Sequence, residues 1–203
     1  MANSFIERSD LKIQAKAMLK GKVVITFLAL LVFWILSGVA ASIYGVGLLI
    51  LGGPLSLGIT IFFLSVVRKE EVKIGDIFKG FNNFVPALVA YILQGIFIFL
   101  WSLLLIVPGI IAWLRYAMTY YIMADNPALD GLEAIKQSKA MMKGHKGRLF
   151  VLYLSFFGWY LLIPLTLGII LIWLAPYMRT ALALFYDDLK KNTQTSGETT
   201  TQA

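Results

Sequence analysis

The sequence predicts an all-α integral membrane protein, a polytopic transmembrane helical bundle of six spans with amphipathic surface helices. Hydrophobic residues make up 59% of the 203 residues, and charged residues make up 14%. Soluble domains average about 45–50% apolar and about 25% charged residues. Six spans of about 20 residues would use about 120 residues of the chain. The composition therefore excludes a water-soluble enzyme, and the lack of cysteine excludes disulfides and thiolate chemistry.

The apolar runs are separated alternately by uncharged and by charged connections. Glycine and proline mark the uncharged ones, at 45–54, 107–109 and 164–168, where we expect tight hairpins. Of the 18 Lys and Arg residues, 16 lie in the leader, the two charged connections and the tail. The positive-inside rule then places both termini in the cytoplasm of a multi-pass protein of the plasma membrane. The six runs occupy residues 23–43, 46–67, 84–106, 108–124, 148–166 and 168–187.

A cleaved signal peptide is an alternative for the N-terminal region, since residues 39–41 weakly resemble a cleavage site. The charged leader is long, however, and the apolar run continues past that point, which favours an uncleaved first span.

The chain also contains three similar units within a single membrane domain, residues 1–189. A Lys-Gly pair precedes each hairpin of apolar runs, at residues 20–21, 79–80 and 143–144. The alternative is that Lys and Gly recur together only because both favour helix C-termini. We interpret the pattern as three repeats of surface helix, span, turn and span, at 9–67, 74–124 and 130–188. The polar residues 190–203 are expected to form a disordered cytoplasmic tail.

Two stretches of the chain have the pattern of amphipathic helices on a membrane surface. In the first, Leu11, Ala15, Met18 and Leu19 recur at helical spacing beside a row of lysines. In the second, Asp130 and Glu133 suit a capping box, and Leu132, Ile135 and Met142 share a face. The basic faces would attract anionic lipid headgroups, by about 1 kcal/mol per residue; the alternative is a solvated face that only fixes topology. The lysines concerned are Lys12, Lys16, Lys20, Lys136, Lys139, Lys143 and Lys146.

Arg115 and Arg179 are the two charges inside the apolar runs. A rise of 1.5 Å per residue places both near mid-depth, where an arginine costs about 2.5–3.5 kcal/mol. We therefore expect both to face the bundle interior and to find partners there. A guanidinium matches phosphate and carboxylate groups, so the functional hypothesis is an anion or lipid-phosphate site. The alternative is that each arginine ties helices together through carbonyl groups. The candidate ligand-binding residues are Arg115, Arg179, Tyr116, Tyr120, Tyr177 and Gln94.

Several motifs occur in an order that resembles an uncharacterised, domain-of-unknown-function family of small bacterial polytopic integral membrane proteins. The resemblance covers nearly everything from residue 8 to residue 189. It implies a compact helical bundle, but no established activity and no catalytic residues. The motifs are Gly53-Pro54-Leu55-Ser56-Leu57-Gly58, Val107-Pro108-Gly109-Ile110-Ile111, Ala124-Asp125-Asn126-Pro127, Leu132-Glu133-Ala134-Ile135-Lys136-Gln137-Ser138, Met142-Lys143-Gly144-His145, and Pro176-Tyr177 with Phe185-Tyr186.

Motifs of known enzyme classes are missing from the sequence. It has no phosphate-binding loop, nucleophile elbow or paired carboxylates, and its single histidine, His145, cannot form a histidine metal cluster. We expect a non-enzymatic module, without cofactor, metal or nucleic-acid binding, that binds membrane lipids or partner membrane proteins. The alternative is a small transporter or channel for an anionic or amphipathic solute that uses the intramembrane arginines. No Asp or Glu lies within a span, which disfavours proton or sodium coupling.

Overall fold

The computed structural model describes the backbone of residues 5–42, 46–160, 162–166 and 168–201, and the side chains of these residues up to 193. No strand occurs in these ranges, so the predicted all-α class is confirmed for the described residues. The elements are α1 (Arg8–Leu19), α2 (Val23–Ser42), α3 (Val46–Val67), the 3₁₀ helix η1 (Ile74–Asn83), α4 (Phe84–Leu104), α5 (Ile106–Tyr116), α6 (Thr119–Asp125), α7 (Gly131–Met141), α8 (Lys146–Tyr160), α9 (Leu162–Leu165) and α10 (Leu171–Thr201).

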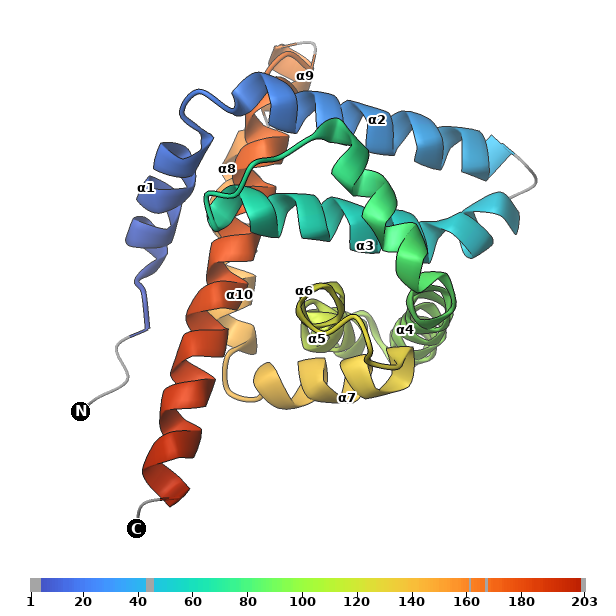
Figure 1. Ribbon diagram of the computed structural model, residues 1–203, viewed down its shortest axis with the longest axis vertical. Coiled ribbons are helices and arrows are strands. Elements are labelled where there is room, and N and C mark those ends of the chain that lie inside the picture. Colours follow the sequence, from blue (N-terminus) through green and yellow to red (C-terminus); the bar gives the residue numbers. More distant parts are fainter. Residues whose placement is uncertain (1–4, 43–45, 161, 167, 202–203) are drawn as a thin grey trace.

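Helix α3 forms the centre of the molecule. Thirteen of its 22 residues are buried, whereas only four of the 20 residues of α2 are. It contacts η1, α2, α4, α6 and α10. In Figure 1, α3 runs beneath α2, while α10 crosses the ends of both helices and α4 to α7 lie below. The helices around α3 pack one face against it, and α2 and α4 leave most of their residues outside the core.

The 3₁₀ helix η1 packs on α3 with almost no space between the two backbones. A 3₁₀ helix repeats every three residues, so Ile77 and Gly80 share the edge that is buried. A Cβ atom on Gly80 would overlap the carbonyl oxygen of Pro54, and one on Gly58 would overlap the carbonyl oxygen of Ile77. Glycine at both positions is thus a packing requirement.

The three Lys-Gly pairs have two different physical causes. Gly21 and Gly144 have φ angles of +80° and +85° and lie just beyond α1 and α7, in the left-handed conformation that commonly ends helices. Gly80 lies within η1 and serves the packing described above. The alternative interpretation, that Lys and Gly recur together because both favour helix C-termini, therefore applies to the pairs at 20–21 and 143–144 but not to the pair at 79–80.

The segment Gly52-Gly53-Pro54 does not form the break that the sequence suggested. Helix α3 continues through Pro54 from Val46 to Val67, which matches the predicted run. A Cβ atom on Gly52 would overlap the ring of Tyr91, and one on Gly53 would overlap the backbone at Ala87. These glycines admit α4 to the surface of α3. The hairpin expected at 45–54 therefore does not extend over residues 46–54, and residue 45 lies outside the described residues.

Four stretches are long and apolar enough to cross a membrane: Val23–Ser42, Val46–Val67, Ile74–Leu104 and Lys146–Leu165. The expectation of six spans is not confirmed. The run at 108–124 is divided into α5 and α6, each of which is too short to span alone. The first 18 residues of α10 include three charges, Arg179, Asp187 and Asp188.

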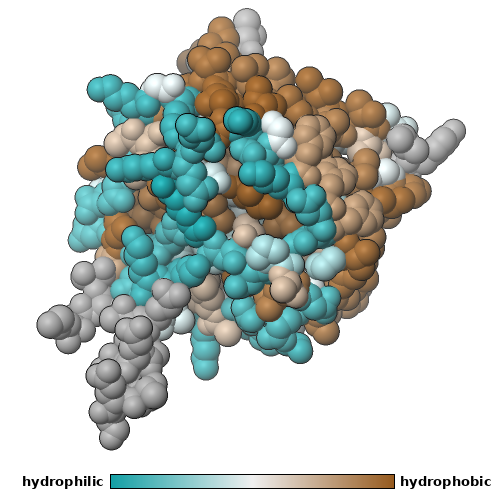
Figure 2. All heavy atoms as spheres, in the orientation of Figure 1, coloured by the Kyte–Doolittle hydropathy of each residue, from teal (hydrophilic) through white to brown (hydrophobic). Residues whose placement is uncertain are grey.

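Polar and apolar residues separate to different sides of the molecule. In Figure 2, hydrophilic residues gather over α1, α7 and the segment before η1, whereas hydrophobic residues cover α2 and the side of α4. The ends of the hairpins far from these charges are the most exposed apolar regions: Leu103 is 75% exposed, Ile106 78% and Leu165 79%. Apolar patches of this extent are typical of surfaces that contact lipid or other protein.

The two predicted surface helices use their apolar faces against protein. Leu11, Ala15 and Leu19 of α1 are buried, and α1 packs on α10. In α7, Ile135 and Met142 are buried as expected, but Leu132 is exposed. Asp130 occupies the N-cap position of α7 without making the predicted capping hydrogen bond.

Helix α10 continues through Thr201, into the segment expected to be a disordered tail. The hydroxyl of Thr193 donates to the carbonyl of Leu189 at 2.8 Å, and the amide of Asn192 donates to the carbonyl of Asp188 at 2.8 Å. Both side chains thus bond to carbonyl groups of the preceding helical turn, at the start of residues 190–203.

We predict that Gly80→Ala destabilises the protein by about 1–3 kcal/mol, the usual cost of overpacking, because the added methyl group meets backbone atoms. The measurement is the free energy of unfolding in detergent micelles. Gly38→Ala in α2 is the matched control, since a Cβ atom there has no neighbour within 4 Å. Equal stabilities of the two variants would contradict the close contact between η1 and α3.

Candidate functional site

A polar cavity of about 300 Å³ lies where α3, α4, α5, α6, α8 and α10 meet. Its apolar lining comes from Trp113, Ala117, Met178 and Leu182. The remaining lining residues carry polar groups. These residues are Ser56, Thr60, Gln94, Tyr116, Tyr120, Tyr121, Tyr153 and Arg179.

The tyrosine-rich wall of the cavity depends on the break between α5 and α6. Ser138 of α7 is fully buried at this break. Its hydroxyl donates to the carbonyl of Arg115 at 2.8 Å and accepts from the backbone N–H of Met118 at 3.2 Å. One serine thus satisfies a carbonyl and an N–H that a continuous helix would have paired, and holds Tyr116 and Tyr120 on adjoining helices beside the cavity.

Most of the polar groups around the cavity lack a partner within the described part of the chain. Thr60 is the exception, because its hydroxyl donates to the carbonyl of Ser56 at 2.7 Å. The Nε2 atom of Gln94 is buried without a hydrogen bond. No hydrogen bond to the four tyrosine hydroxyls or to the Arg179 guanidinium occurs among the described residues. More than 90% of buried polar groups in proteins are paired, so the buried Nε2 atom of Gln94 is an exception. The hydroxyls and the guanidinium that line the cavity are free to bind a ligand or water.

Arg179 supplies the charge of the cavity. Among the described lining residues, no other side chain is ionised near neutral pH and none is acidic. Its guanidinium lies 6.0 Å from the ring centre of Phe33, within reach of a cation–π interaction. The cavity is therefore electropositive.

The structure brings together four of the six residues predicted to bind a ligand: Arg179, Gln94, Tyr116 and Tyr120 all line the cavity. Arg115 and Tyr177 do not. Arg115 lies at the α7 crossing, where its carbonyl, not its guanidinium, is bonded. Neither arginine side chain has the protein hydrogen-bond partner that we expected, within the described residues.

Tyr177, which we predicted to bind a ligand, packs against the rings of Phe156 and Trp173, with ring centres 5.2 and 4.6 Å away.

The cavity also contains residues that sequence reasoning missed. The cavity residues that we did not predict are Ser56, Thr60, Trp113, Ala117, Tyr121, Tyr153, Met178 and Leu182. Ser56 and Thr60 are four residues apart in an apolar run, and this spacing was a usable signal, because it places both on one face of a helix.

The predicted lipid-contact lysines have different surroundings. Lys12 turns inward, since its ammonium donates to the carbonyl of Ser155 at 3.1 Å and lies 4.7 Å from the ring centre of Phe156. Burial, with the nearby charge of Arg8, lowers its pKa. Lys146 is half-buried, and Lys136 pairs with Glu133 at 3.4 Å. The exposed lysines of the set are Lys16, Lys20, Lys136, Lys139 and Lys143.

A second cluster, of charged residues, joins the C-terminal ends of α3 and α6 to the middle of α10. Arg68, just after α3, binds Asp125 at 2.6 Å and Asp187 at 2.9 Å. Asp125 also accepts from Lys190 at 2.5 Å and from the hydroxyl of Tyr186 at 2.9 Å. Burial alone would raise the pKa of Asp125, but these hydrogen bonds outweigh it and hold the pKa below its usual range.

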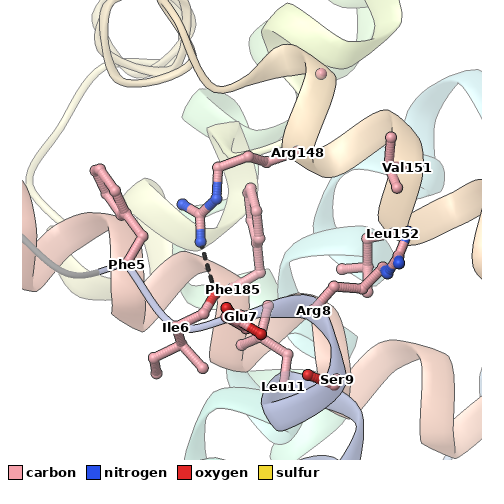
Figure 3. Close-up of a pocket in the computed structure, with 11 residues that line it drawn as sticks. Phe5, Ile6, Glu7, Arg8, Ser9, Leu11, Arg148, Val151, Leu152 and Phe185 are labelled. Atoms are coloured by element: carbon pink, nitrogen blue, oxygen red, sulfur yellow. Dashed lines mark hydrogen bonds between the residues drawn. The ribbon is translucent and has the colours of Figure 1, made fainter.

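Arg148 fastens the N-terminal segment to α10. Its guanidinium donates to the carbonyl of Ile6 at 2.9 Å and pairs with Asp188 at 3.0 Å, and Asp188 accepts from the N–H of Ile6 at 3.2 Å. Figure 3 shows this arginine between Phe5 and Phe185, beside a shallow pocket of about 470 Å³. These contacts hold the segment before α1 against α10, on the polar side of the molecule.

We predict that Asp125→Asn lowers the free energy of unfolding at neutral pH by about 1–3 kcal/mol, because it leaves Arg68 and Lys190 without their carboxylate. Arg68 is one-third exposed, so water limits the loss. The depressed pKa means that this stabilisation is present above the ordinary Asp pKa of about 3.9 and is lost as the pH falls through the folded-state value. The difference between wild type and variant in thermal melts should therefore shrink in acid.

Glu71→Gln is the control for this variant, because Glu71 is exposed and has no ion pair among the described residues. A loss of stability equal to that of Asp125→Asn would show that the cluster has no special importance.

Comparison with known proteins places the chain in a family but provides no function. No curated protein and no solved structure matches it. The family described as "Protein of unknown function (DUF975)" matches residues 1–114 and 103–193. These two matches together cover nearly the whole sequence, in agreement with the resemblance carried by the motifs. The chain therefore belongs to the DUF975 family, an uncharacterised family of unknown function.

Proposed function

We propose that this protein is a non-enzymatic integral membrane protein that binds an anionic group, a phosphate or a carboxylate, in the cavity beside Arg179. In this proposal the polar side faces the cytoplasm from the plasma membrane, and the chain is built from three hairpin units with both termini inside. The observation that carries the proposal is a single unpaired arginine, surrounded by unpaired polar groups, on a cavity without an acidic residue in its described lining.

The chemistry of the lining supports an anion. A guanidinium offers five donors in a plane that fits phosphate or carboxylate oxygens. The hydroxyls of the tyrosines and the amide of Gln94 can donate to the same oxygens. An anion placed here would satisfy the donors and neutralise the charge together. A cation would meet Arg179 with no acid to offset the repulsion.

Binding without chemistry also fits the lining. The described lining residues carry hydroxyl groups but include no histidine, carboxylic acid or thiol, so no common general base stands beside those hydroxyls to activate them. Proton- or sodium-coupled transport would call for an intramembrane carboxylate, which the described lining does not offer. Transport of an anion is the second candidate function, because it would use the same cavity.

The exposed lysines of the polar side form a second part of the proposal. Lys16, Lys20, Lys136, Lys139 and Lys143 would attract anionic headgroups at the membrane surface, whereas Lys12 is already engaged. The same face could serve a partner membrane protein with an acidic surface.

We predict that Arg179→Gln weakens binding of dioleoyl phosphatidylglycerol about 10- to 100-fold, because hydrogen bonds to a charged group contribute about 1.5–3 kcal/mol. Native mass spectrometry of the detergent-solubilised protein measures this affinity, with phosphatidylcholine as the zwitterionic comparison. A parallel titration with inorganic phosphate shows whether a free anion binds as a lipid headgroup does.

Arg115→Gln is the matched control, since it removes the same charge from a residue that does not line the cavity. Equal weakening in both variants would contradict the assignment of the site to the cavity. Anion flux in proteoliposomes that disappears in Arg179→Gln would favour transport over binding alone.

A further inference from the structure

A second hollow, an apolar groove of about 520 Å³, adjoins the polar cavity. The groove and the cavity share three lining residues, Gln94, Trp113 and Tyr120. The two spaces therefore meet at these side chains. One side of the junction is polar and electropositive, and the other is apolar.

The groove opens on the part of α4 that faces away from the protein. Ile92, Ile96 and Phe99 line it and are 41%, 47% and 67% exposed. The described residues of its lining include no charged side chain. Gly95 lies in its middle, and a Cβ atom built there has no neighbour within 4 Å. Glycine at this point leaves open space along the helix, on a surface whose chemistry matches hydrocarbon.

Gln94 stands at the boundary between the two environments. Its Nε2 atom is buried and has no hydrogen-bond partner among the described residues. An unpaired amide in an apolar helix is costly unless a ligand or water completes it. Gln94 borders both spaces, and a molecule that extends from one into the other would pass beside it.

We infer that the ligand is a membrane amphiphile with an anionic headgroup at Arg179 and a hydrocarbon chain in the groove along α4, so that it enters sideways from the bilayer. This inference rests on the proposed function, and it adds the class of ligand and the route. The polar cavity accounts for the headgroup by charge complementarity, and the adjoining groove, which shares three lining residues with it, accounts for the chain. Water-soluble anions would use the cavity and leave the groove unused.

The test uses a hexadecyl phosphate probe with a photoreactive diazirine at mid-chain, added to the full-length protein in phosphatidylcholine nanodiscs. After illumination, peptide mass spectrometry locates the adducts. We expect adducts on α4 within residues 91–99. Gly95→Phe, which fills the groove, should lose most of the adduct, and Gly95→Ala should lose less. Gly38→Phe is the matched control, because Gly38 also faces open space but lies on α2 outside the groove, and it should keep the adduct.

The outcomes separate this inference from the function on which it rests. An adduct that Arg179→Gln diminishes but Gly95→Phe leaves unchanged would overturn the groove and keep the anion site. An adduct insensitive to Arg179→Gln would overturn both. Adducts outside α4 in the wild-type protein would also overturn the route. Thermal melts of Gly95→Ala and Gly95→Phe against Gly38→Phe show whether a lost adduct reflects a blocked groove in a folded protein.

Discussion

The architecture depends on how closely other backbones can approach helix α3. Glycines at positions 52, 53 and 58 leave its surface bare, and η1 and α4 rest directly on the backbone there. Ser56 and Thr60 lie in this same stretch and form one wall of the polar cavity. The packing that makes α3 the centre of the molecule therefore also fixes the position of that wall. A side chain that pushed η1 or α4 away would disturb the cavity together with the core.

Charge is handled in two opposite ways within the protein. At the polar side, Arg68, Asp125 and Lys190 satisfy one another, and Arg148 pairs with Asp188. Arg179, which lines the cavity, has no ion pair among the described residues, and its guanidinium lies 6.0 Å from the ring centre of Phe33. In the proposed site, an anionic ligand would supply the opposite charge that the described residues do not offer to Arg179.

Part of the fold was predictable because it follows from composition and periodicity. The all-α class and the bounds of α3 follow directly from the apolar runs. The continuity of α3 through Gly52-Gly53-Pro54 was not predictable in this way, because these residues usually signal a turn. Their role in α3 is to admit Tyr91 and the backbone at Ala87, which are distant in the sequence. The division of the run at 108–124 likewise depends on Ser138, a residue of another helix.

The site was predictable in part, because a charged residue within an apolar run is rare and can be identified from the sequence alone. Arg179 and three of its neighbours could be singled out from the sequence. Arg115 looked equivalent to Arg179, and only the three-dimensional arrangement separates them, since the helix break places Arg115 beside α7 instead of the cavity. The pairing of Asp125 with Arg68 joins residues 57 positions apart, and no local pattern indicates such a contact. Tyr153 comes from α8, and its membership of the site depends on how α8 packs.

The measurement that tests the central claim most directly uses the absence of cysteine from the chain. Ser56→Cys places one thiol of nearly unchanged size in the cavity wall, and Thr26→Cys places one in α2, fully buried and outside the cavity. Each variant is treated with an anionic and with a cationic methanethiosulfonate reagent of similar size. We expect that the thiol at position 56 reacts faster with the anionic reagent, that Arg179→Gln abolishes this preference, and that the thiol at position 26 reacts with neither. A thiol at position 56 that does not react, or a preference that survives Arg179→Gln, would contradict an anion site at Arg179.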